Sequence, residues 1–244
     1  MKFYTGLGNA EAIADKGVAM HQLVEGIHHF HNIGFRERQE LFSRLRQGQQ
    51  PEACMITCAD SRIVPNLITN SQPGELFIVR NVGNIIPCFG TNNNGEMAAI
   101  EYAVAELGIE DIIVCGHTGC GAMNALVNQT TTDDPRRLGL VTSWLRHAQA
   151  TLEIVRDHYG HLQGEKLADI AAEENVLVQL EHLRTLPVIA SRVPSGRVRL
   201  HGWMYKINSG EVFFYESETG QFLKFGDASI STSEGVAVAG RRTS

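Results

Sequence analysis

Two apolar segments that end in possible metal ligands constrain the fold of this chain most strongly. Residues 53–57 are followed directly by Cys58. Residues 112–116 are followed by His117 and, three positions later, by Cys120. Short apolar runs of this kind are typical of buried strands, and the carboxyl ends of parallel strands meet at one edge of an α/β sheet, where sites are built. We therefore expect the two thiols and the imidazole to lie close together.

Two cysteines and one histidine form a ligand set that zinc favours. Zinc binds thiolate sulfur and imidazole nitrogen in tetrahedral geometry, and a catalytic zinc site keeps its fourth position open. Because no fourth thiol is evident, Cys58, His117 and Cys120 predict a catalytic zinc rather than a structural one. The alternative is that both cysteines are buried at strand ends and the histidine lies in a loop.

The composition is that of an ordinary globular protein, with 43% hydrophobic and 20% charged residues among 244. A formal net charge of -6, without a basic stripe that carries aromatic residues, argues against a nucleic-acid partner. Five cysteines, an odd number in a long chain, favour a reducing cytoplasm over a disulfide framework. We find no signal peptide and no apolar run of membrane-spanning length, so no membrane partner is expected.

The remaining pattern predicts an α/β fold, with a mostly parallel central β-sheet flanked by helices, an N-terminal helical arm and a C-terminal antiparallel hairpin. Strands are expected at residues 53–58, 76–79 and 109–115, and the hairpin at 197–207 and 211–215. Helices are expected at residues 10–31, 35–46, 96–107, 121–127, 137–158 and 166–185. The strand–helix–strand order implies a right-handed parallel crossover.

Three regions follow from this pattern. Residues 1–48 form an N-terminal helical arm that is expected either to pack on a partner subunit or, equally, to cover its own sheet. Residues 49–225 form the zinc-binding α/β catalytic core. Residues 226–244 are small, polar and weakly patterned, and we expect this C-terminal tail to dock on a neighbouring subunit.

The motifs around the ligands resemble those of the β-class carbonic anhydrases. Cys58-x-Asp60-x-Arg62 followed by His117-x-x-Cys120 is the central match. Further matches lie at residues 74–77, 80–84, 101–104 and 201–203. The resemblance implies reversible hydration of carbon dioxide to bicarbonate and a proton, on a zinc ion held by the three ligands. It also implies a homodimer or a higher multiple of dimers, and cyanobacterium-like flanks suggest carboxysome components as further partners.

Asp60 and Arg62 are the expected catalytic pair. Asp60 is close enough to Cys58 to become a fourth zinc ligand, which would expel water and stop the reaction. Arg62 can hold the carboxylate away through a bidentate pair and leave it a lone pair to orient a zinc-bound hydroxide. The alternative is an exposed ion pair that contributes under about 1 kcal/mol.

The substrate pocket is assigned from the resemblance. Gln49 matches a glutamine that donates a hydrogen bond to substrate, and Phe77, Val82 and Tyr102 match residues that line the pocket. An apolar slot suits carbon dioxide, and the partner subunit is expected to supply Gln49, Phe77 and Tyr102. Core packing is the alternative for Phe77 and Val82.

Three positions bear on regulation by bicarbonate. Met55 and Thr57 stand where relatives regulated by bicarbonate have tryptophan and glycine. Arg80 matches their bicarbonate arginine but could equally brace the strand end. Gln49 together with Met55 leads us to expect the open form, in which Asp60 is bonded to Arg62 rather than to zinc and the enzyme is constitutively active. The alternatives to carbon dioxide hydration as the function of the whole chain are a non-catalytic zinc scaffold and a hydrolase of carbon disulfide or carbonyl sulfide.

Overall fold

The computed structural model describes residues 10–91, 94–128 and 138–226 and forms two compact units, Met1–Gln50 and Pro51–Ser244. The N-terminal unit is helical. Its elements are α1 (Ala10–His29), a π-helical segment (Phe30–Gly34), α2 (Phe35–Glu37) and α3 (Gln39–Leu45). The break expected between residues 31 and 35 is therefore a π-helical segment. The rings of Phe30, Phe35 and Phe42 contact one another across these short elements.

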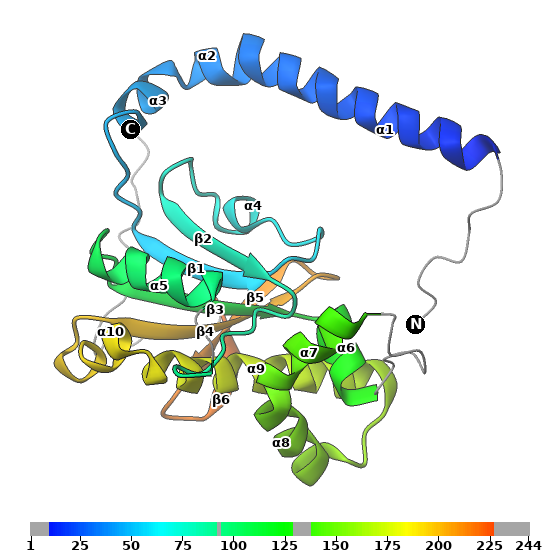
Figure 1. Cartoon of the computed structure of the whole chain (residues 1–244), viewed down its shortest axis with the longest axis vertical. Coiled ribbons are helices and arrows are strands. Elements are labelled where there is room, and N and C mark those ends of the chain that lie inside the picture. Colours follow the sequence, from blue (N-terminus) through cyan, green and yellow to red (C-terminus); the bar gives the residue numbers. More distant parts are fainter. Residues whose placement is uncertain (1–9, 92–93, 129–137, 227–244) are drawn as a thin grey trace. The chain divides into compact units, whose positions relative to one another are not determined.

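The second unit is built on a six-stranded sheet with the order β2-β1-β3-β4-β5-β6 (Figure 1). The strands are β1 (Ala53–Cys58), β2 (Leu76–Asn81), β3 (Asp111–His117), β4 (Arg199–Lys206), β5 (Glu211–Glu216) and β6 (Gln221–Lys224). The first four are parallel, and β5 and β6 pair antiparallel. The predicted mostly parallel sheet with a C-terminal antiparallel hairpin is confirmed, although β6 was not predicted.

Helices cover one face of this sheet. They are α5 (Gly95–Ala105), α6 (Gly121–Asn128), α7 (Gly139–Leu145), α8 (Gln149–Tyr159), α9 (Gly164–Thr185) and α10 (Pro187–Ala190), while α4 (Pro65–Thr69) follows β1. The larger apolar core lies between these helices and the sheet. The single helix predicted for residues 137–158 is wrong in one respect, because a 3-10 turn at Arg146–Ala148 separates α7 from α8. Residue 137 and the tail beyond residue 226 lie outside the described residues.

The third strand ends two residues later than predicted, and this places a ligand. Residues 109–115 were expected, but β3 runs from Asp111 to His117 because its parallel pairing with β4 continues to the pair His117–Tyr205. In the same way β2 continues to Asn81, which pairs with Cys58. His117 therefore ends a hydrogen-bonded strand, as Cys58 does, rather than lying in the loop beyond it.

Two glycines let α9 approach the sheet closely. A Cβ atom on Gly116 would lie 2.7 Å from Val176 Cγ2, and one on Gly202 would lie 2.9 Å from Val176 Cγ1. A real Cβ atom essentially never lies within 3.0 Å of a non-bonded heavy atom, so alanine at either position would push the helix away. The close packing fixes α9 against β3 and β4, which brings its polar side chains near the ligands.

Candidate metal centre

The three predicted ligands meet at the carboxyl-terminal edge of the sheet. Cys58 is the last residue of β1, His117 is the last residue of β3, and Cys120 directly precedes α6. Their ligand atoms lie within 4.8 Å of one another, and all three side chains are buried. Among the described residues, this is the one group of three or more His, Cys, Asp or Glu side chains that could hold a metal ion.

The imidazole of His117 is oriented for ligation. Its Nδ1 lies 2.9 Å from the carbonyl oxygen of Thr118, which can only accept, so Nδ1 carries the proton and donates it. Nε2 then carries a lone pair, and it is buried without a hydrogen-bond partner in the described part of the chain. A buried acceptor that lies near two sulfur atoms and has no donor of its own fits a metal ion.

The two thiols shift each other's pKa in opposite directions. A hydrogen bond from Cys120 lowers the pKa of Cys58, against the effect of burial, and the hydrogen bond from the Gly83 N–H acts in the same direction. The same hydrogen bond, together with burial, raises the pKa of Cys120. Cys58 is therefore the more acidic of the two thiols, and a divalent cation bound there would hold both as thiolates.

Two other cysteines in the sheet, Cys54 and Cys115, have raised pKa values. Burial raises the pKa of Cys54 to about 12, and burial also raises that of Cys115 to about 12. Both thiols are therefore protonated fillers in the apolar interior.

The carboxylate of Asp60 faces the guanidinium of Arg62. Arg62 Nε donates to Oδ1 at 2.9 Å and Nη2 donates to Oδ2 at 2.7 Å, which is a bidentate pair. The Arg62 side-chain hydrogen bonds are the main cause that lowers the pKa of Asp60 to about 2. Arg80 donates to the carbonyl oxygens of Cys58 and Asp60, at 3.1 and 2.7 Å, so it braces this strand end.

The expected pocket residues occupy three places. Val82 is 41% exposed and directly precedes Gly83. Phe77 and Tyr102 have ring centroids 6.2 Å apart, with Phe77 partly buried against the core and Tyr102 46% exposed. Gln49 belongs to the N-terminal unit, where its side chain is exposed.

A turn that sequence reasoning missed supports Cys58. The Gly83 N–H donates to Cys58 Sγ at 3.4 Å, and the Gly83 carbonyl accepts from Asn175 Nδ2 at 3.0 Å. Trp144 Nε1 donates to the carbonyl of Val82 at 2.8 Å. Gly83 has a φ of 81°, and a Cβ there would lie 2.9 Å from that of Ala122, so only glycine fits. The glycine lies within a matched motif, but nothing in the sequence pointed to Asn175 or Trp144.

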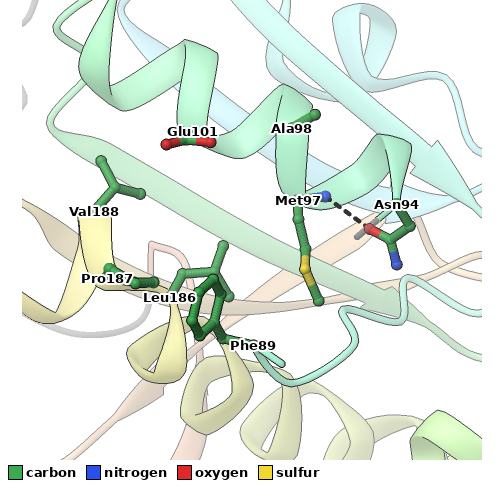
Figure 2. Close-up of a pocket in the computed structure, with 8 residues that line it drawn as sticks. All are labelled: Phe89, Asn94, Met97, Ala98, Glu101, Leu186, Pro187 and Val188. Carbon is green, nitrogen blue, oxygen red and sulfur yellow. Dashed lines mark hydrogen bonds between the residues drawn. The ribbon is translucent and has the colours of Figure 1, made fainter. Parts of the chain in front are cut away.

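A separate hollow of about 410 Å³ lies between α5 and α10 (Figure 2). It is lined by Phe89, Asn94, Met97, Ala98, Glu101, Leu186, Pro187 and Val188. The one hydrogen bond drawn there is the helix cap, in which Met97 N–H donates to Asn94 Oδ1 at 3.0 Å. None of these residues is a predicted ligand, catalytic residue or pocket residue.

Comparison with known proteins identifies the family. The family model described as carbonic anhydrase matches residues 53–212. The carbonic anhydrase of Synechocystis sp. is 47% identical over 204 residues, which cover 84% of this chain and 74% of that protein. The structure of the β-carbonic anhydrase CcaA has a TM-score of 0.82 and 46% identity, and covers 84% of this chain and 99% of that one. A tetrameric β-carbonic anhydrase of Sordaria macrospora has a TM-score of 0.71 and 25% identity, and the match covers 80% of this chain and 96% of that one.

Fold, ligand set and similarity agree. The chain belongs to the carbonic anhydrase family, and within that family to the β class. It is an enzyme, a lyase that hydrates carbon dioxide to bicarbonate. The predicted family and reaction are confirmed, and the sulfur and nitrogen donors of the Cys–His–Cys group fit zinc.

Proposed function

We propose that Cys58, His117 and Cys120 bind Zn2+ and that carbon dioxide is hydrated beside it. The observation that carries this proposal is the buried Nε2 atom of His117, which has no described hydrogen-bond partner and lies near two sulfur atoms. Zinc bound there would act as a Lewis acid and lower the pKa of a bound water, which provides a nucleophile near neutral pH. The Gly83 N–H supports the Cys58 thiolate and withdraws charge from it.

Asp60 and Arg62 are the proposed catalytic pair. With both carboxylate oxygens engaged by Arg62, Asp60 is held in a fixed orientation and kept ionised. Oδ1 accepts from both the backbone N–H and Nε of Arg62, whereas Oδ2 accepts from Nη2 alone and retains lone-pair capacity. Oδ2 therefore accepts a hydrogen bond from the substrate complex and orients it. This arrangement is the open form, which supports a constitutively active enzyme.

The substrate pocket is proposed to form between two subunits of a homodimer or a higher multiple of dimers. Val82 lines it from the subunit that holds the metal, and the exposed Tyr102 with Phe77 and Gln49 lines it from the partner. Exposed apolar side chains on the N-terminal unit support an arm, residues 1–48, that packs on a partner subunit. They are Met20, Leu23, Val24, Ile27, Phe30, Ile33 and Phe35. The tetrameric Sordaria macrospora relative supports an oligomer.

The remaining proposals concern regions and location. Residues 49–225 form the catalytic core, and residues 226–244 dock on a neighbouring subunit. Among the described helices, none has the length and apolar character that crossing a membrane requires. We place the enzyme in the cytoplasm, where it serves carbon utilization, and cyanobacterial relatives support an association with carboxysome components.

Two measurements on wild type and Cys58→Ser test this function: the rate of carbon dioxide hydration by stopped flow, and the zinc content. We expect about one zinc per wild-type chain and rapid hydration, with both reduced in the variant because serine is a poor zinc ligand. Equal, negligible rates in both proteins would contradict the proposal and favour a zinc scaffold. Faster turnover of carbonyl sulfide or carbon disulfide than of carbon dioxide would favour the hydrolase.

A further inference from the structure

Gly119 lies between two of the ligands, and side chains from elsewhere hold both of its backbone polar groups. Its N–H donates to Asp169 Oδ1 at 2.7 Å, and its carbonyl oxygen accepts from Arg62 Nη2 at 3.0 Å. Its φ of 63° is in the left-handed region, which glycine adopts without strain. Two segments that are far apart in the chain therefore meet at this one residue.

The residue before Gly119 is anchored by the sheet instead. The Thr118 N–H donates to the Tyr205 carbonyl at 3.0 Å, and Thr118 Oγ1 accepts from the Ile207 N–H at 3.1 Å. The loop from His117 to Cys120 is therefore held by the end of β4 on one side. The contact from the helical side is supplied by Asp169.

Asp169 reaches this loop because α9 packs unusually close to β3. The carbonyl oxygen of Ala172 lies 3.2 Å from where a Cβ of Gly116 would be. Asp169 precedes Ala172 by three residues and so lies on the same side of α9, nearer the ligand loop. A carboxylate that accepts a backbone N–H bond at 2.7 Å makes a strong, charge-assisted hydrogen bond.

We propose that Asp169 is a positioning residue that fixes Gly119 and, through it, holds Arg62 on Asp60. This proposal rests on the function proposed above. Arg62 has two anchors, the carboxylate of Asp60 and the carbonyl of Gly119, and Nη2 serves both. If the Gly119 N–H loses its acceptor, the carbonyl is free to turn and the guanidinium keeps one anchor. The Asp60 carboxylate then gains the freedom to take the fourth position on the metal.

Asp169→Ala and Asp169→Asn test the role of this hydrogen bond in the full-length protein. Cobalt(II), substituted for zinc, provides a readout besides activity, because its visible absorption changes when a carboxylate joins the ligands. We expect Asp169→Ala to shift the cobalt spectrum and to lower kcat about tenfold or more, with metal still bound. Asp169→Asn should retain most of both properties, since its amide oxygen accepts the same N–H. Adding Asp60→Asn to Asp169→Ala should remove the spectral shift.

Glu165→Ala is the matched control, because it removes a carboxylate from the first turn of the same helix and should change neither readout. Thermal unfolding of each variant identifies any that fail to fold, and the Asp169→Asn protein then carries the comparison. A wild-type cobalt spectrum in Asp169→Ala would overturn the proposal, as would an Asp169→Asn protein as impaired as Asp169→Ala. If the variants show the expected cobalt shifts but the wild type binds metal and hydrates no carbon dioxide, the proposed function is refuted instead.

Discussion

The two edges of the parallel sheet carry the same residue types but arrange them differently. At the carboxyl edge lie Asp60, Arg62 and His117. At the amino edge lie Asp111, Arg199 and His201, where Asp111 accepts from Arg199 Nε at 2.8 Å and Nη2 at 2.6 Å. The Nε2 atom of His201 also lies 2.8 Å from Asp111, whereas the Nε2 atom of His117 has no described partner.

The difference shows what separates a structural cluster from a site. At the amino edge Asp111 is on β3 and both its partners are on β4, so the cluster ties two neighbouring strands together. At the carboxyl edge the Asp60–Arg62 ion pair lies within one turn after β1, and only Arg62 reaches further, to the Gly119 carbonyl beyond β3. The pair lies beside a buried ring nitrogen that is left free for a ligand. Residue types alone do not distinguish the two edges, but the unsatisfied atom does.

The largest expected effect comes from changing the histidine at each edge. His117→Ala removes a metal ligand and with it the Lewis acid, so kcat/KM should fall about a thousandfold or more and zinc content should drop. His201→Ala should leave kcat/KM within about twofold, because its only described polar contact is with Asp111. Stopped-flow hydration and metal analysis of both proteins check this contrast. A large loss of activity in His201→Ala with normal zinc content would break it.

A smaller effect is expected when the arginine at each edge becomes lysine. Lysine keeps the charge but cannot form the bidentate pair, so Arg62→Lys should lower kcat about 10- to 100-fold while zinc remains bound. Arg199→Lys makes the same change at the amino edge and should leave kcat unchanged. Steady-state kinetics at several pH values measure both. If the two variants behave alike, the pair at the carboxyl edge has no catalytic part.

The ligand set could be predicted from the sequence because Cys58 and His117 end strands that are recognisable by themselves and Cys120 follows three residues after His117. The exact strand ends could not, since β3 continues to His117 only because β4 pairs with it. In the same way β6 was missed, because its four residues include polar Gln221 and Lys224 and are short for a strand.

The contacts that orient the ligands could not be predicted either. Asp169 and Asn175 come from α9, about 50 residues or more after the ligands, and reach them only because Gly116 and Gly202 let the helix approach. No motif marks these residues, since their role depends on how a helix packs on the sheet. Local pattern thus predicts the ligands, and tertiary packing determines what supports them.

The smallest expected effect concerns acid stability at the amino edge. Burial alone would raise the pKa of Asp111, but hydrogen bonds from His201 and Arg199 outweigh it and hold the pKa well below its usual range. A depressed pKa stabilises the fold above the unfolded value, near 4, and that contribution is lost as pH falls toward the folded value. Asp111→Asn should therefore lower the free energy of unfolding by about 1 kcal/mol at pH 7, the group being partly exposed. Urea unfolding at pH 7, 5 and 3.5 should show the gap from wild type narrowing only below about pH 4, with kcat unchanged at pH 7. A gap that stays constant throughout would mean that the Asp111 charge does not stabilise this edge.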